Sequence, residues 1–584
     1  MRQYVISLKR GIDCKQFWYE MENTTQGLSS IPDRAVDVVE DYDDFDRLCG
    51  YALTDYEAIA LRQDPRVAAV EIPFSEQEGV KIMPFASQNN DFTKPVNDNS
   101  GGANENLVNW GLVRHSNPTN VYGVSTSTDL PYRYTLNGGG IDLVISDSGI
   151  QGNHPEFQYI GNSTSRVQSV NWASYEPALA TMPNPLQDPD GHGTNVAGIA
   201  AGKTYGWAKG ALIYSIVATG TGSPDPIDQF RAILRWHRSK TSNRPTVVNM
   251  SWGLVTPWQY LAGLPPDTPA NLANLTLATN LILSRIIDIQ WRSGFYPPTN
   301  VTTRGLLLDP SNIDCLYSLA NNIPARNSAV DTALGSLIDA GIIVVRSAGN
   351  SSYKIDKSSG GTGDFNNNFL LSSPFGLFYY NRGSSPTDTL EYDIDVGSLD
   401  SVAASAAQDQ KAKYSCSGPG VDIYAAGTKI LSASTSNTAA PEFSQSASYF
   451  LDNSFRQINL TGTSMASPQV AGMICLYLQA QPVANIYSVG NSLTVKSWVT
   501  GQATNTMYSP GNSTSYTDFR STLGGSAKVS YQNIQGLTQI KTGLQTWKPV
   551  KSVLVKNNVG TWTEVKNIWV KDGEQWKPVY TDPT

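Results

Sequence analysis

The sequence predicts an α/β protein with a doubly wound parallel sheet, preceded by a small α+β domain and followed by a β-repeat module. Three observations lead to this prediction. Short apolar strands alternate with helical segments between residues 105 and 505, which is the pattern of a parallel sheet covered on both faces. Residues 1–80 carry a separate β-α-β-β-α-β pattern. Residues 506–584 contain tryptophan motifs that repeat between turn residues.

The bulk composition bounds the class of protein. At 584 residues, with 40% hydrophobic and 16% charged residues, the chain is expected to be globular, with about three or four domains. The net charge of −8 comes without a long basic block, so the charge pattern of a nucleic-acid-binding protein is missing. No apolar run is long enough to span a membrane, and the first residues lack the apolar stretch of a signal peptide. The compartment stays open.

Cysteine usage gives no sign of a metal or disulfide framework. The five cysteines are widely scattered and form no Cys-x-x-C or Cys/His pair. We interpret them as buried thiols. They are Cys14, Cys49, Cys315, Cys416 and Cys475.

The N-terminal domain, residues 1–80, contains four expected strands and two expected helices. The strands are expected at 3–8, 35–39, 48–53 and 66–72, and the helices at 15–21 and 56–62. Thr54 and Asp55 are helix-start residues, and Asp64-Pro65 stops the same helix. This order is typical of a ferredoxin-like split βαβ unit. Residues 81–104 are rich in Ser, Asn, Asp and Gly, and we interpret them as a linker without regular structure.

The central domain, residues 105–505, contains three clear apolar strands. They are expected at 141–145, 247–250 and 341–345, and small polar residues follow each of them. Loops at the carboxyl ends of such strands are where functional sites lie. Two long insertions, about 254–325 and 351–390, interrupt the pattern; insertions of this length are functional loops or small subdomains.

The C-terminal extension, residues 506–584, repeats itself. Similar segments begin at Trp547, Trp562 and Trp576, and turn residues separate them. Alternating side chains between these turns predict a β-meander module.

Three separated segments supply the groups that nucleophilic acyl transfer needs. Asp147 directly follows an apolar strand, His192 lies among small residues at a helix start, and Ser464 precedes a helix expected at 469–478. A serine hydroxyl needs a base to accept its proton near neutral pH, and a neutral imidazole suits this role. A buried carboxylate must then hold the other ring N–H. Each segment alone is also compatible with a helix cap or a structural histidine.

A fourth segment supplies donors for a developing oxyanion. Asn350 follows the strand expected at 341–345 and carries a side-chain NH₂ group. The backbone N–H of Ser464, at a helix N-terminus, is a second donor. The four segments together predict an Asp-His-Ser triad with an Asn-containing oxyanion hole.

The motifs D-S-G, H-G-T-x-V-A-G, A-G-N and G-T-S-M-A-S-P, in this order along residues 105–505, resemble the subtilisin-like serine proteases, or subtilases. The chain order Asp, His, Ser is the one known from a member of that family, so these roles are implied by the resemblance. The resemblance implies a subtilisin-like fold and a serine endopeptidase that needs no cofactor. The residues that it implies for peptide-substrate binding are Ser251, Trp252, Gly253, Ala348 and Gly349.

Residues 1–80 resemble the inhibitory propeptide of that family. The resemblance implies a module that occupies the active-site cleft of its own chain and is removed by a cut between about 74 and 104, with no bond singled out. The C-terminal repeats are similar to short repeats at the ends of bacteriophage virion proteins, which implies virion proteins as partners. An alternative hypothesis is therefore a virion structural or attachment protein with a latent or single-use protease domain.

Two departures from the family pattern affect the expectations. Asn195 stands where the family has a second histidine, away from the proton transfer. Glu156 falls where relatives have an acidic calcium ligand, but the turn at 202–206 is shorter than their calcium loop, so a structural calcium site is left open. Among the other histidines, His115 and His237 are expected on exposed surfaces, and His154 is expected to be structural.

Overall fold

The computed structural model describes most of residues 1–87, 109–256 and 323–532, and the strands within 539–581, with short gaps inside these ranges. The greater part of the insertion expected at 254–325, the polar linker from residue 88 onward and Cys315 lie outside the described residues, as does most of the insertion at 351–390.

The N-terminal unit is a four-stranded antiparallel sheet with two helices. The sheet order is β2-β3-β1-β4. The elements are β1 (Arg2–Leu8), α1 (Cys14–Glu22), β2 (Val38–Asp41), β3 (Leu48–Leu53), α2 (Asp55–Leu61) and β4 (Val67–Glu71). Helix α2 begins at a capping box, in which the Thr54 hydroxyl and the Glu57 carboxylate each accept from the other residue's backbone N–H. Strand β2 lies about three residues later than expected.

A seven-stranded sheet forms the centre of the molecule, and all its strand pairs are parallel. The order is β17-β16-β13-β10-β7-β9-β8. The strands are β7 (Asp142–Asp147), β8 (Val167–Gln168), β9 (Leu212–Val217), β10 (Thr246–Met250), β13 (Ile343–Ser347), β16 (Ile394–Leu399) and β17 (Ile423–Ala426). Strand β13 begins two residues later than expected because Gly341, with a φ of 88°, belongs to the turn after helix α10.

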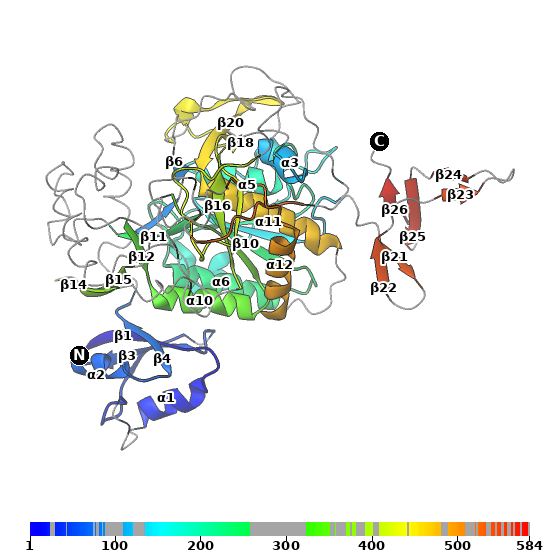
Figure 1. Cartoon of the computed structure of the whole chain (residues 1–584). Helices are drawn as coiled ribbons and strands as arrows, with labels where there is room; N and C mark the ends of the chain where they lie inside the picture. The colour runs from blue at the N-terminus through cyan, green and yellow to red at the C-terminus, as the bar shows by residue number, and fades with distance from the viewer. Residues whose placement is uncertain are drawn as a thin grey trace.

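Helices cover both faces of this sheet (Figure 1). On one face, α5 (His192–Ala201) and α11 (Thr463–Ala480) pack with α12 (Val489–Gln502) against Leu143 and Ile145. On the other, α6 (Pro226–Ser239) and α10 (Ser328–Asp339) pack against Val144 and Val248. Alternate residues of one strand thus enter different cores, which explains why these strands are apolar throughout.

Shorter elements complete the described chain. They are α3 (Trp110–His115) and the 3-10 helices η2 (Pro155–Phe157), η3 (Trp172–Ser174), η4 (Pro177–Thr181) and η8 (Phe443–Gln445). A five-stranded sheet, in the order β14-β15-β12-β11-β5, consists of β5 (Lys81–Pro84), β11 (Trp252–Thr256), β12 (Ile323–Arg326), β14 (Phe369–Ser373) and β15 (Gly376–Tyr380). A third sheet consists of β6 (Ala86–Ser87), β18 (Ile430–Ser434), β19 (Ala447–Tyr449) and β20 (Asp452–Gly462).

The linker expected at 81–104 therefore begins with ordered backbone. Strands β5 and β6 pair with β11 and β20 of the central domain. The expectation that the linker lacks regular structure is wrong for residues 81–84 and 86–87. Composition indicated too little apolar surface for independent order, but these residues obtain backbone hydrogen bonds from distant strand edges instead.

The central core continues past residue 505. Met507 and Val529 are buried in the core cluster that contains α5 and α11. Farther on, the tryptophan repeats form three hairpins, and each strand pairs with its hairpin partner rather than in one continuous meander within the described residues. The hairpin strands are β21 (Gln539–Thr542), β22 (Thr546–Pro549), β23 (Leu554–Lys556), β24 (Trp562–Glu564), β25 (Asn567–Asp572) and β26 (Gln575–Thr581). No helix in the described part of the chain could cross a membrane.

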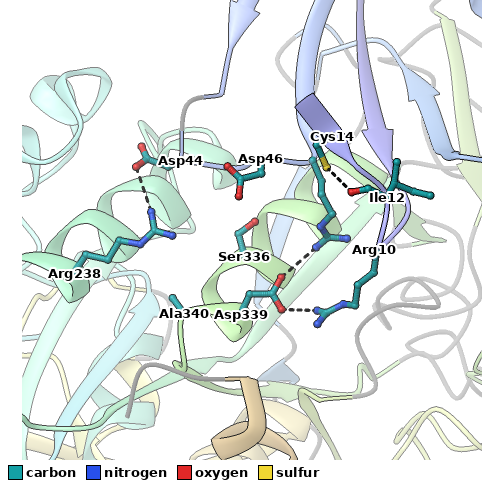
Figure 2. A pocket seen from close by; sticks show the side chains of 11 residues that line it. Arg10, Ile12, Cys14, Asp44, Asp46, Arg238, Ser336, Asp339 and Ala340 are labelled. Atoms are coloured by element: carbon teal, nitrogen blue, oxygen red, sulfur yellow. Dashed lines mark hydrogen bonds and ion pairs between the residues drawn. The ribbon is translucent and has the colours of Figure 1, made fainter. Parts of the chain in front are cut away.

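The N-terminal unit packs on α6 and α10 of the central domain (Figure 1). Phe45 and Leu48 enter the same apolar cluster as residues of these helices. Ion pairs surround a hollow of about 570 Å³ between the two units. As Figure 2 shows, Asp339 of α10 faces Arg10 of the N-terminal unit, and Asp44 faces Arg238 of α6. Asp339 also pairs with Arg47 of the N-terminal unit.

Candidate active site

Asp147 and His192 meet at the carboxyl edge of the parallel sheet. Asp147 is the last residue of β7, and His192 is the first residue of α5. The Nδ1 atom of His192 lies 2.6 Å from Oδ1 of Asp147, and both side chains are 1% exposed. Because an aspartate oxygen accepts, Nδ1 carries the proton in the neutral imidazole.

Two glycines allow this close approach. Gly191, with a φ of 101°, forms the N-cap of α5 in the left-handed region. Gly193 packs so tightly that an added Cβ would lie 2.1 Å from the backbone oxygen of Gly149, two residues after Asp147. The small residues around His192 are therefore a packing requirement of the site.

Asp188 joins the Asp147 turn to the His192 helix, and the sequence interpretation missed it. Its carboxylate accepts from the Ser148 hydroxyl at 2.8 Å, from the Gly191 N–H at 2.8 Å and from the Thr194 N–H at 2.8 Å. The Ser148 oxygen in turn accepts from the Gly193 N–H at 2.9 Å. Burial raises the pKa of Asp188, although these donors oppose that shift. An aspartate four residues before the histidine, within a turn, was the available signal.

Ser464 is the second residue of α11 and is fully buried. Its Oγ donates to the backbone oxygen of Ser251 at 3.0 Å. Helix α11 begins at Thr463, six residues earlier than expected, and contains Pro468. The expected start at residue 469 was wrong, since Pro468 lies inside the helix rather than before it.

The Ser251 hydroxyl supplies a hydrogen bond that Pro468 cannot. In a regular helix the N–H of residue 468 would donate to the carbonyl of residue 464, but proline has no N–H. Ser251 Oγ donates to that Ser464 oxygen at 2.9 Å. Asn249 Nδ2 donates to Ser251 Oγ at 2.9 Å and so helps to orient it. The first turn of α11 is thus held by the strand end beside it.

Asn350 is hydrogen-bonded to Thr463, the residue before Ser464. The Asn350 Oδ1 atom accepts from the Thr463 N–H at 2.9 Å and from its hydroxyl at 2.8 Å. Thr463 Oγ1 also accepts from the N–H of Gly349 at 3.1 Å. Ala348 is held by donation of its N–H to Val396 at 3.0 Å. These contacts fix which side of the Asn350 amide carries the NH₂ group.

Strand β11 borders the site on the other side of Ser464. Trp252 and Gly253 follow Ser251 directly and pair with Pro84 and Met83 of β5. The Trp252 indole points into the core, where Nε1 donates to Ser146 Oγ at 3.1 Å and the ring stacks on Phe230. The part of β11 that faces β5 is therefore its backbone, as substrate-strand recognition requires.

Glu156 does not fit the calcium-ligand role that the resemblance left open. Its Oε1 atom accepts from the N–H groups of Thr204 and Tyr205 at 2.6 and 2.7 Å, and Oε2 accepts from the Tyr449 hydroxyl at 2.7 Å. The nearby turn carbonyls of Lys203 and Thr204 accept from the buried Lys209 ammonium. Among the described residues, no group of three or more His, Cys, Asp or Glu could hold a metal ion.

The expected exposure of two histidines is wrong. His115 and His237 are both fully buried. His115 Nε2 accepts from the Ala426 N–H at 2.8 Å while Nδ1 lies 2.7 Å from the Ser530 oxygen, so its ring joins three segments. The neighbouring arginine suggested a surface, but Arg114 is itself buried in an ion pair with Asp409. His154 is buried and hydrogen-bonded to Arg456 O, consistent with a structural role.

Comparisons with known proteins identify the family of the chain. A model of the subtilase family matches residues 138–517. The chain is 25% identical over 440 residues to an extracellular serine proteinase of Thermus sp., covering 75% of this chain and 68% of that protein. It is 24% identical over 505 residues to a subtilisin-like proteinase of Pyricularia oryzae, covering 82% and 69%.

Among solved structures, the chain is similar to a cold-adapted subtilisin-like serine proteinase. The two sequences are 20% identical, and the TM-score is 0.41, with 72% of this chain and 97% of that one covered. The family match spans well over half of the chain and includes Asp147, His192, Asn350 and Ser464. The chain belongs to the subtilase family and is a serine-type endopeptidase.

Proposed function

We propose that the chain hydrolyses peptide bonds with Ser464 as nucleophile, His192 as general base, Asp147 as the residue that orients His192, and Asn350 as an oxyanion donor. The observation that carries this proposal is the buried contact of 2.6 Å between His192 Nδ1 and Asp147 Oδ1, beside the start of α11. The hydroxyl of Ser464 donates to Ser251 O in the structure. For reaction it turns toward Nε2 of His192, since such hydrogen bonds tighten in the substrate complex.

The first chemical step forms an ester. As Ser464 Oγ attacks the substrate carbonyl carbon, His192 Nε2 takes the hydroxyl proton, and Asp147 stabilises the resulting imidazolium. His192 then gives the proton to the leaving amine. Water attacks the ester with His192 again as base, which releases the acid and restores Ser464. Burial of both Asp147 and His192 strengthens their interaction, because little water screens it.

Two donors stabilise the oxyanion of each tetrahedral intermediate. One is the NH₂ of Asn350, whose orientation follows from the two hydrogen bonds that Thr463 donates to its Oδ1. The other is the backbone N–H of Ser464 in the first turn of α11, where helix N–H groups have no intrahelical acceptor.

The substrate is proposed to be an extended peptide that adds a strand beside β11. Ser251, Trp252 and Gly253 would form its backbone hydrogen bonds, with Ala348 and Gly349 bordering the residue before the cut. The pairing of β5 with β11 supports this mode of binding, since it demonstrates that this edge accepts an antiparallel strand.

The N-terminal unit is proposed to act as an inhibitory module that the protease cuts from its own chain. Two features support the proposal. The unit contacts α6 and α10 through ion pairs and apolar side chains. Its last strand, β4, is also followed in the chain by β5, which pairs with β11. Glu71, at the end of β4, also accepts from the Ser328 N–H at the start of α10 at 2.7 Å. A negative charge is stabilised at that end of a helix.

The test compares wild type with Ser464→Ala by intact mass and by labelling with a fluorophosphonate. Labelled and shortened wild type beside unlabelled full-length Ser464→Ala is the expected result. If both stay full length and unlabelled, the alternative gains weight: a virion structural or attachment protein, joined to other virion proteins through its tryptophan repeats, whose protease domain is latent.

A further inference from the structure

Two neighbouring strands near the end of the N-terminal part of the chain pair with strands that adjoin the start of α11. Met83 and Pro84 of β5 lie opposite Gly253 and Trp252 of β11. Ala86 and Ser87 of β6 lie opposite Gly462 and Thr461 of β20. Strand β20 runs directly into α11, whose second residue is Ser464.

Both pairings end beside Ser464. The pairing with β11 ends at Trp252, and the residue before it is Ser251. The pairing with β20 ends at Gly462, and the residue after it is Thr463. In the sequence, one residue, Phe85, joins Pro84 of the first pairing to Ala86 of the second. Ser251 is the residue whose backbone oxygen accepts from Ser464 Oγ, and Thr463 precedes Ser464.

Resting on the function proposed above, we infer that the chain cuts itself at one defined bond, Phe85–Ala86. Ser464 Oγ bonds to the carbonyl carbon of Phe85, and the bond from that carbon to the nitrogen of Ala86 breaks. His192 transfers the serine proton to the Ala86 amine. One water then hydrolyses the ester, so the products are a carboxylate at Phe85 and a new N-terminus at Ala86.

The burial of the nucleophile indicates that this cut occurs within one molecule. Ser464 and His192 are 0% and 1% exposed in the uncut chain, so a second protein cannot reach the hydroxyl while β5 and β6 remain paired. The order of residues around the bond also predicts the substrate class. Pro84, Phe85 and Ala86 imply a preference for an aromatic or large apolar residue before the cut and a small residue after it.

The experiment refolds the denatured full-length chain at two concentrations and follows cleavage by intact mass and N-terminal sequencing. Wild type is expected to give Ala86 as the new N-terminus at a rate that does not depend on concentration. Ala86→Pro should block the cut, because the bond nitrogen becomes part of a ring, whereas Ala103→Pro in the same linker should be cut normally. Phe85→Asp should slow cleavage about 10-fold or more, and Phe85→Leu should slow it far less.

Fluorophosphonate labelling separates this inference from the proposed function. A Ser464-dependent cut at another bond would overturn the inference and leave the triad in place. A wild type that stays uncut and unlabelled, beside a variant that is labelled once residues 81–87 are replaced by Gly and Ser, would do the same, since the segment would then be a bound strand rather than a substrate. An uncut wild type whose Gly/Ser variant is also unlabelled would overturn both.

Discussion

The Oδ1 atom of Asn350 accepts a hydrogen bond from the backbone N–H of Thr463 at 2.9 Å, immediately before Ser464. This contact sets the orientation of the amide whose NH₂ group is the proposed oxyanion donor. Asn350→Leu, of similar size, should lower kcat about 10²–10³-fold with little change in KM, a magnitude taken from a member of the same family. Cleavage of a chromogenic peptide by the mature enzyme measures it.

A matched change tests the orientation rather than the donor. Thr463→Val removes the hydroxyl that also donates to Oδ1 of Asn350 but keeps the backbone donor. We expect a smaller fall in kcat, about 10-fold, as for the loss of one ordinary hydrogen bond. If Asn350→Leu keeps the wild-type kcat, Asn350 is not an oxyanion donor.

Ser251 should be a positioning residue whose importance depends on Pro468. Ser251→Ala leaves the Ser464 carbonyl without the donor at 2.9 Å, so kcat should fall about 10-fold while KM changes little. Adding Pro468→Ala restores an N–H that can donate within the helix. The double variant should therefore recover most of the lost kcat, whereas Pro468→Ala alone should have little effect. Additive losses in the double variant would contradict this account.

Glu156→Ala should destabilise the central domain strongly. It removes the acceptor of two backbone N–H groups and the Tyr449 hydroxyl, and it takes a negative charge away from buried Arg166 and Lys209. Loss of a buried charge partner costs about 3–5 kcal/mol. Thermal unfolding in a Ser464→Ala background measures the loss, and added calcium should not restore it. A large stabilisation of the parent by calcium would instead indicate a site at Glu156 or elsewhere.

Protonation of buried histidines should weaken the fold in acid. Burial lowers the pKa of His115 to about 3, and that of His154 and His237 to about 4. The unfolded chain, with ordinary histidine pKa values near 6.5, binds more protons at acidic pH, so each histidine lowers stability as pH falls from about 6.5 toward 4. The slope of the unfolding free energy against pH should therefore fall by the contribution of about one proton in His115→Gln. Urea unfolding between pH 4 and 7, in a Ser464→Ala background, measures this slope. An unchanged slope would exclude His115 as a contributor.

Glu71 should help to hold the N-terminal unit after the cut. Its carboxylate accepts from the Ser328 N–H at the start of α10 and is 3% exposed. A charge-assisted hydrogen bond contributes about 1.5–3 kcal/mol, so Glu71→Ala should speed release of the unit about 10- to 100-fold. Gel filtration of the processed complex detects the release. Glu76→Ala removes only an exposed ion pair with Arg2 and should have little effect.

Local patterns in the sequence indicate most of the central fold and the residues that we propose as the reacting groups. The strands β7 and β10 are apolar because both faces are covered, and this makes them recognisable without any partner. The motifs around Asp147, His192, Asn350 and Ser464 are recognisable because close packing and chemistry restrict neighbouring residues, as Gly193 demonstrates. These properties depend on residues adjacent in the chain.

Only the tertiary structure decides contacts between segments that are distant in sequence. The pairing of β5 with β11 and of β6 with β20 joins such segments. So do the hydrogen bond from Ser251 to the Ser464 carbonyl and the burial of His115. Each depends on which donor and acceptor the folded chain brings together. A polar or short segment gives no sign of this, since its local composition is the same whether its hydrogen bonds go to water or to a distant strand.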